Sequence, residues 1–238
     1  MKDPIFIGSS VAIVTPFTNG MINYDRFHEL IDWQIASGTS AITVCGTTGE
    51  SSTLSSCEYE ELLFKCVEFV DGRVKVIAGA GSNNTMHALD LCHKAEDIGV
   101  DGLLIVTPYY NKTTQPGLIN HYTYIADRVK TPIIMYSVPS RTGMSLSIEA
   151  LKILSQHPMI NGLKDANSNL SQMVGTIAEC GDNLNIWSGN DDETVALMSM
   201  GAKGVISVWA NIEPDKVTSL TEACINAVSY THLRAHET

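Results

Sequence analysis

The chain has 238 residues, of which 44% are hydrophobic and 17% charged, and its formal net charge at pH 7 is -11. This apolar content supports a packed core and excludes disordered, collagen-like and coiled-coil classes of protein. The acidic balance argues against nucleic-acid binding, and no run approaches the roughly 18 apolar residues of a membrane span. The N-terminus leaves no room for a signal peptide, so we predict a cytoplasmic protein that binds neither nucleic acid nor membranes.

Short apolar runs rich in β-branched residues recur along the chain between turn residues. Nearly continuous apolar runs are typical of strands that helices cover on both faces. In chain order, the predicted strands are Val11–Pro16, Ala41–Gly46, Lys75–Gly81, Gly102–Pro108, Pro132–Pro139, Ile160–Ala166, Leu184–Asn190 and Gly204–Asn211.

Between these runs, apolar residues recur at the three- and four-residue spacing of amphipathic helices. The predicted helices are Tyr24–Ser37, Ser55–Val70, Asn84–Ile98, Gln115–Val129, Ser147–Gln156, Asn169–Cys180, Asp191–Met200 and Glu213–Ala227. Ser55 and Glu58 have the spacing of a capping box, and Ser147 and Asp191 are expected N-caps.

Strands and helices alternate without a shift in composition, which makes residues 1–227 one predicted α/β domain. Parallel strands need helical crossovers of this size. An open doubly wound sheet would also satisfy the alternation. Eight complete βα units favour a closed (β/α)8 TIM barrel, whose active site lies at the carboxyl ends of the strands.

The cysteines and histidines carry little functional signal. Six cysteines lie mostly inside apolar patterns without a CxxC pair, so we expect buried, reduced thiols. Seven histidines form no HExxH motif or ligand cluster, so we expect no metal site.

Lys164 is the most informative polar residue, because it lies inside the apolar run of the sixth strand. A lysine that points into a barrel is desolvated, which lowers the pKa of its amine and exposes a nucleophilic lone pair. Such an amine can form a Schiff base with a ketone. The alternative is a lysine at the strand end that pairs with Asp165 or extends to solvent.

Thr47 and Thr48 lie between two glycines at the end of the second strand. Their hydroxyls and backbone N–H groups are suited to hold a small carboxylate. A glycine-rich turn with a threonine cap is the alternative, and the segment is no P-loop because no lysine follows the second glycine. Gly79 and Gly81 lack the third glycine of a dinucleotide fingerprint, and we interpret them as a tight turn.

Tyr136 lies near the end of the fifth strand, and Arg141 follows that strand. A phenol in a low-dielectric barrel mouth can relay protons, although a core tyrosine with a satisfied hydroxyl is equally consistent with the pattern. A guanidinium can grip a carboxylate in bidentate fashion, and a surface salt bridge is its alternative.

Six motifs on successive strands together resemble the dihydrodipicolinate synthase family, within the class I pyruvate-dependent aldolases. They are Gly46–Ser51 (GTTGES), Thr107–Asn111 (TPYYN), Tyr136–Gly143 (YSVPSRTG), Gly162–Ala166 (GLKDA), Ser188–Asp191 (SGND) and Gly204–Val208 (GVISV). The resemblance runs from about Ile5 to Ala227, nearly the whole chain.

The resemblance implies a catalytic set. Lys164 matches the lysine that forms the Schiff base with pyruvate, and Tyr136 matches the proton donor and acceptor. Thr47 and Tyr110 match its relay partners, and Tyr110 is expected to reach across a dimer interface into the neighbour's site. The family assembles as a homotetramer, a dimer of dimers, and needs no metal or organic cofactor.

The resemblance also implies substrate-binding residues. Thr48 matches a residue that holds the pyruvate carboxylate, and Arg141 matches the arginine that receives the carboxylate of aspartate 4-semialdehyde. Gly189 and Ile206 are also expected to bind substrate, Ile206 through its backbone. The expected reaction condenses pyruvate with this aldehyde in lysine and diaminopimelate biosynthesis. Alternatives are N-acetylneuraminate lyase, a keto-deoxy sugar-acid aldolase, a binding protein or an inactive truncated barrel.

Regulated members of the family bind the inhibitor lysine between subunits. The matching positions here are Ser51, Asn83, His87 and Tyr109. His87 stands where a glutamate often stands, so an acidic partner for the inhibitor's ammonium group is missing. We therefore expect weak or absent inhibition by lysine.

The C-terminal segment departs from the family pattern. Family members usually continue into a C-terminal helical domain, which we expect to be largely missing here. Residues 228–238 do not continue the pattern, and we interpret them as a non-native tail.

Overall fold

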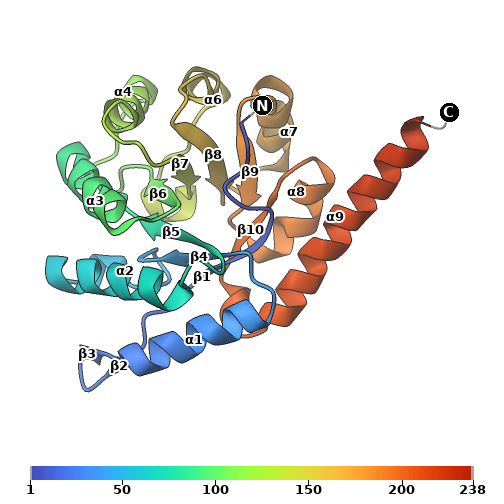
Figure 1. Ribbon diagram of the computed structural model, residues 1–238. Coiled ribbons are helices and arrows are strands. Elements are labelled where there is room, and N and C mark those ends of the chain that lie inside the picture. The colour runs from blue at the N-terminus through green and yellow to red at the C-terminus, as the bar shows by residue number, and fades with distance from the viewer. Residues whose placement is uncertain (1, 237–238) are drawn as a thin grey trace.

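A closed barrel of parallel strands forms the centre of the molecule (Figure 1). The computed structural model describes residues 2–236, with side chains described through Ala227. Each strand pairs with its neighbours along the chain, and the last pairs with the first, so the (β/α)8 barrel is confirmed and the open sheet is wrong. The barrel strands are β1 (Gly8–Ala12), β4 (Ala41–Val44), β5 (Lys75–Gly79), β6 (Gly102–Val106), β7 (Ile133–Ser137), β8 (Ile160–Asp165), β9 (Asn185–Ser188) and β10 (Gly204–Ser207).

Helices surround this barrel on the outside (Figure 1). The principal helices are α1 (Tyr24–Ala36), α2 (Ser56–Val70), α3 (Thr85–Ile98), α4 (Gln115–Ala126), α6 (Ile148–Ser155), α7 (Leu170–Cys180), α8 (Thr194–Ser199) and α9 (Pro214–His236). Short elements lie in the loops: the hairpin β2 (Phe17–Thr18) and β3 (Met21–Ile22), α5 (Pro139–Thr142), and the 3-10 turns η1 (Ser51–Thr53), η2 (Asp191–Glu193) and η3 (Trp209–Asn211).

Side-chain caps begin several of the helices. At α2 the Ser55 hydroxyl accepts a hydrogen bond from the Glu58 N–H, and the Glu58 carboxylate accepts one from the Ser55 N–H, so the predicted capping box is confirmed. Ser147 caps α6 as predicted. The predicted cap at Asp191 is wrong, because its carboxylate accepts hydrogen bonds from the backbone after β10 instead.

Two apolar layers hold the barrel together. The outer layer lies between the strands and the helices, and the inner layer fills the barrel with alternate residues of each strand. The inner layer includes Ile77, Leu104, Ile134 and Trp187. Lys164 and Tyr136 follow the same alternation, which directs their side chains into the barrel.

The N-terminal segment closes the barrel at the end opposite the carboxyl ends of the strands. Phe6 stacks on Trp187 with ring centroids 5.1 Å apart, and the Trp187 indole donates a hydrogen bond to the Phe6 carbonyl. The Lys2 ammonium donates to the carbonyls of Ser155, His157 and Ile160, which precede or begin β8. The amino-terminal end of the barrel is therefore sealed.

Several predicted boundaries are wrong. The first strand is Gly8–Ala12 rather than Val11–Pro16, because the hydroxyls of Ser10 and Thr43 hydrogen-bond to each other at 2.9 Å and make a polar segment buriable. Strands five and eight end earlier, where Pro139 begins α5 and Trp209 begins η3.

The last helix also differs from its prediction. It ends at His236 rather than at Ala227. Within residues 2–236, α9 is the last element and no separate helical domain follows the barrel. Our interpretation of residues 228–238 as a non-native tail stays a prediction, and residues 237–238 lie outside the described residues.

The cysteines are unpaired, and four of them are buried as expected. Cys57 is exposed and Cys224 is half-buried, so the expectation of buried thiols is wrong for these two.

Candidate active site

Lys164 lies inside the barrel near the carboxyl end of β8. It pairs in register with Tyr136 of β7 on one side and with Trp187 of β9 on the other. Its side chain is only 4% exposed, so extension to solvent is excluded. No ion pair among the described residues joins it to Asp165, because successive side chains of a strand point to opposite faces.

The surroundings of Lys164 lower the pKa of its amine from 10.5 to about 8. Burial is the main cause, because an ammonium loses its hydration shell inside the barrel. The Asp191 carboxylate opposes this effect, and the Arg141 guanidinium adds to it. The ammonium nitrogen lies 4.5 Å from the centroid of the Tyr136 ring. The amine therefore combines burial, a lowered pKa and an aromatic neighbour, which suits a nucleophile.

Tyr136 and Arg141 share the electrostatic environment of this lysine. Burial raises the pKa of the Tyr136 phenol, and the charge of Arg141 lowers it in part. Arg141 lies in the short helix α5, directly after β7, with an exposed side chain at the rim. It has no ion pair among the described residues, which removes the surface salt bridge as its explanation.

Gly189 packs directly over the stem of Lys164. A Cβ atom at this position would lie 2.8 Å from Ala166 Cβ, 2.9 Å from the Asp165 carbonyl oxygen and 3.1 Å from Lys164 Cε. The Gly189 N–H also donates a 2.6 Å hydrogen bond to the Asp165 carbonyl. Ile206 is fully buried in the same inner apolar layer as Tyr136. The structure thus brings together Lys164, Tyr136, Gly189 and Ile206, with Arg141 acting on the lysine and tyrosine.

The loop after β4 carries Thr47 and Thr48 and turns tightly. Cys45 and Glu50 adopt positive φ angles of 54° and 58°, and the Glu50 N–H donates to the Thr47 carbonyl. Thr47 is exposed and Thr48 is half-buried.

Gly79 and Gly81, at the end of β5, do not form the tight turn that we predicted. Gly79 is the last residue of β5, and a Cβ there would lie 2.1 Å from the Cys45 carbonyl oxygen. A Cβ at Gly81 would lie 2.5 Å from the Val106 N–H nitrogen. Both glycines permit close packing between neighbouring strand ends.

Tyr110 is exposed to solvent within one chain. It is 92% exposed and has a positive φ of 69°, which few residues other than glycine adopt. The neighbouring Tyr109 is partly exposed. This loop therefore presents aromatic side chains outward rather than to its own barrel.

The predicted regulatory residues lie on segments that follow β4, β5 and β6. Ser51 begins η1, and His87 lies in the first turn of α3. The Asn83 carbonyl accepts a 3.4 Å hydrogen bond from Asn111, which links its loop to that of Tyr109.

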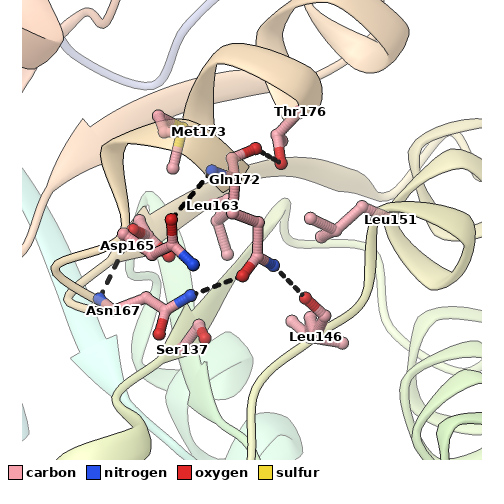
Figure 2. Close-up of a pocket in the computed structure, with 10 residues that line it drawn as sticks. Ser137, Leu146, Leu151, Leu163, Asp165, Asn167, Gln172, Met173 and Thr176 are labelled. Atoms are coloured by element: carbon pink, nitrogen blue, oxygen red, sulfur yellow. Dashed lines mark hydrogen bonds between the residues drawn. The ribbon is translucent and has the colours of Figure 1, made fainter.

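Two acidic residues near Lys164 were missing from our predicted site. Asp191 was interpreted as a helix cap, although the pattern that selected the other candidates, a polar residue after a strand, also selects it. Asp165 points to the outer face of β8, into a narrow crevice against α6 and α7 (Figure 2). Burial raises the pKa of Asp165 from 3.8 to about 6.

The crevice at Asp165 supports the loop that follows β8. Figure 2 shows a chain of hydrogen bonds in which the Asn167 amide donates to Gln172, and Gln172 donates to the Leu146 carbonyl. The Asn167 N–H donates to the Asp165 carboxylate at 3.4 Å. This network holds the carboxyl end of β8 in place on its outer face, toward α6 and α7.

Among residues 2–227, whose side chains the structure describes, no three His, Cys, Asp or Glu side chains gather as metal ligands. No described helix combines the length and apolar character of a membrane span.

A desolvated lysine at the carboxyl ends of barrel strands, beside a buried tyrosine, defines a lyase of the class I aldolase type. Residues 5–236 match the model of the Dihydrodipicolinate synthetase family, and the chain belongs to this family.

Named relatives agree with this assignment. The 4-hydroxy-tetrahydrodipicolinate synthase of Geobacter sulfurreducens is 49% identical over 98% of this chain and 80% of its own length. That of Thermoanaerobacter sp. is 48% identical over 94% of this chain and 75% of its own length. The crystal structure of dihydrodipicolinate synthase from Aquifex aeolicus is similar at a TM-score of 0.91 and 39% identity, over 98% of this chain and 81% of that chain.

Proposed function

We propose that the protein condenses pyruvate with L-aspartate 4-semialdehyde to give 4-hydroxy-tetrahydrodipicolinate, in lysine and diaminopimelate biosynthesis. The observation that carries this proposal is the buried Lys164 amine, whose lowered pKa suits Schiff-base formation with a ketone. Membership of the family and the names of its relatives supply the substrates.

The lowered pKa has a quantitative consequence for the nucleophile. An amine with a pKa of about 8 is about one tenth neutral at pH 7, whereas one at 10.5 is about 0.03% neutral. The surroundings of Lys164, chiefly its burial, therefore raise its reactive fraction by roughly two orders of magnitude.

The first half of the reaction takes place on pyruvate. The Lys164 amine adds to the C2 carbonyl, and loss of water gives an iminium ion. Loss of a methyl proton then gives an enamine, with the iminium nitrogen as the electron sink. We assign the proton transfers to Tyr136, with Thr47 and with Tyr110 of a second subunit as relay partners.

In the second half, the enamine carbon attacks the aldehyde of aspartate 4-semialdehyde and forms the carbon–carbon bond. The amino group of the added substrate then attacks the iminium carbon, which closes the ring and releases the lysine amine. We assign the pyruvate carboxylate to Thr48, the second substrate's carboxylate to Arg141, and further substrate contacts to Gly189 and Ile206. The role of Arg141 is supported by its exposed position at the rim and by its lack of an ion pair within the described residues.

Exposure of Tyr110 supports assembly through this loop. A 92% exposed tyrosine on a loop with a positive φ is suited to enter a neighbouring subunit. We propose the homotetramer of the family, a dimer of dimers.

A trapping experiment tests the proposed chemistry. The protein is incubated with pyruvate, reduced with borohydride and digested, and the adduct is mapped by mass spectrometry. We expect the adduct on Lys164 and none in Lys164→Met, with Lys130→Met, a change at an exposed lysine, as the control. A folded wild-type protein without this adduct would refute the proposal. Product formation with aspartate semialdehyde but not N-acetylneuraminate would separate the synthase from the lyase.

We further propose weak or absent feedback inhibition by lysine at the site of Ser51, Asn83, His87 and Tyr109. The absence of a carboxylate at position 87 supports this. Half-inhibition at submillimolar lysine in a steady-state assay would contradict it.

A further inference from the structure

Asp191 connects two loops at the mouth of the barrel. It begins η2, two residues after Gly189, and its Oδ2 accepts hydrogen bonds from the N–H groups of Val208 and Trp209 at 3.1 and 3.0 Å. Val208 directly follows β10, the strand that carries Ile206. The Asp191 Oδ2 atom therefore links the end of β9, where Gly189 packs over Lys164, to the end of β10.

The second oxygen of this carboxylate is unusual. Asp191 Oδ1 is buried and has no hydrogen-bond partner among the described residues. A buried carboxylate oxygen normally accepts a hydrogen bond, since leaving it unpaired costs free energy. The Asp191 Oδ1 atom is therefore free to interact with a cation at the barrel mouth.

Lys164 is the cation whose charge Asp191 favours. The charged groups that act on the lysine come from two elements, Asp191 after β9 and Arg141 in α5, and the Tyr136 ring faces it from β7. Arg141 repels a positive charge on the lysine nitrogen, so Asp191 is the group that favours it. The neighbouring Asp192 is exposed, and Glu193 accepts a hydrogen bond from Asn190.

We propose that Asp191 is a positioning residue for the Schiff-base lysine: it holds the loop after β9 to the backbone after β10, and its unpaired oxygen serves the cationic nitrogen. This inference rests on the proposed function. The nitrogen carries a positive charge twice, as the ammonium of the free enzyme and as the iminium ion after loss of water. The Asp191 charge favours both forms.

Removal of the Asp191 charge is expected to raise the rate of Schiff-base formation at low pH and to lower kcat. Without the carboxylate, the amine loses its proton at lower pH, so the acid limb of Schiff-base formation moves to lower pH. The iminium ion is also less stable, so kcat falls. Loss of a residue that only supports the fold would lower kcat without moving the acid limb.

The test compares Asp191→Asn, which keeps an oxygen acceptor and removes the charge, with Asp192→Asn, which removes the same charge from an exposed neighbour. The rate of borohydride-trapped adduct formation with pyruvate is measured from pH 5.5 to 9 by intact mass. We expect Asp191→Asn to move the acid limb about 1 pH unit lower, and its kcat to fall at least about tenfold. Asp192→Asn should superimpose on the wild type in both measurements.

An unchanged acid limb in folded Asp191→Asn, or the same shift in Asp192→Asn, would overturn the inference. If circular dichroism shows that Asp191→Asn does not fold, Asp191→Ser, which is also uncharged and carries an acceptor oxygen, must show the same shift. A wild-type protein that traps no pyruvate at any pH refutes the proposed function instead, so the two failures are distinguishable.

Discussion

Replacing Lys164 by methionine is expected to remove Schiff-base chemistry and to stabilise the fold. Methionine has a similar length and no charge, and the site is buried among Tyr136, Trp187 and the inner apolar layer. The fall of the lysine pKa from 10.5 to about 8 measures what the buried charge costs. At about 1.4 kcal/mol for each pH unit, the cost is about 3 kcal/mol.

The stability difference between Lys164→Met and the wild type is expected to depend on pH. The unfolded lysine keeps its proton up to a pH near 10.5, and the folded one loses it near 8. Between these values the unfolded state binds more protons, so the free energy of unfolding of the wild type rises with pH. The advantage of Lys164→Met is therefore complete below pH 8 and disappears as the pH approaches 10.5.

Thermal and urea unfolding at pH 7 and pH 10 measure the difference. For a domain of this size, about 3 kcal/mol corresponds to a Tm increase of roughly 6–12 °C at pH 7. Lys130→Met is the matched control, because that side chain is exposed, and its Tm should stay within about 2 °C of the wild type. An equal or lower Tm for Lys164→Met at pH 7, or a difference that does not narrow with pH, would refute the reasoning.

Three further changes have defined outcomes. Gly189→Ala places a methyl group against Ala166 and Lys164, so we expect a loss of about 1–3 kcal/mol in urea unfolding and slower pyruvate trapping. Tyr136→Phe keeps the ring beside the lysine, so kcat should fall about 10²–10⁴-fold in a steady-state assay while Tm changes by less than about 2 °C; unchanged kcat would exclude the proton-transfer role. Asp165 ionises at about pH 6 when folded and at 3.8 when unfolded, so its charge destabilises the fold above pH 6. Asp165→Asn should therefore be more stable than the wild type at pH 8, by up to about 3 kcal/mol, and equal below pH 4 in urea titrations.

The centre of the site could be predicted from the sequence because its signal is local. Lys164 stands in an apolar run, and strand alternation alone places its side chain on one face. Tyr136 follows from a similar argument, since polar residues at the carboxyl ends of barrel strands gather at one end, whereas Gly189 was expected only from the family resemblance.

The parts that could not be predicted depend on distant partners. The first strand was misplaced because Gly8, Ser9 and Ser10 look polar, and their burial depends on contacts such as that of Ser10 with Thr43. Asp191 has the spacing of a helix cap, but its hydrogen-bond partners lie after β10, in another loop. No pattern within a short window of sequence contains that information.

The N-terminal contacts of the barrel set an order for folding during synthesis. Gly8 of β1 pairs with Gly204 of β10, and Phe6 needs Trp187 to complete its stack. The N-terminal segment leaves the ribosome first. One edge of β1 therefore stays unpaired until β10 has been synthesised, near the end of the chain. Pairings so far apart in sequence fold slowly, and the open edge is prone to aggregation in the meantime. A nascent chain stopped before β10 should therefore depend on chaperones, whereas one that includes β10 can close the ring on its own.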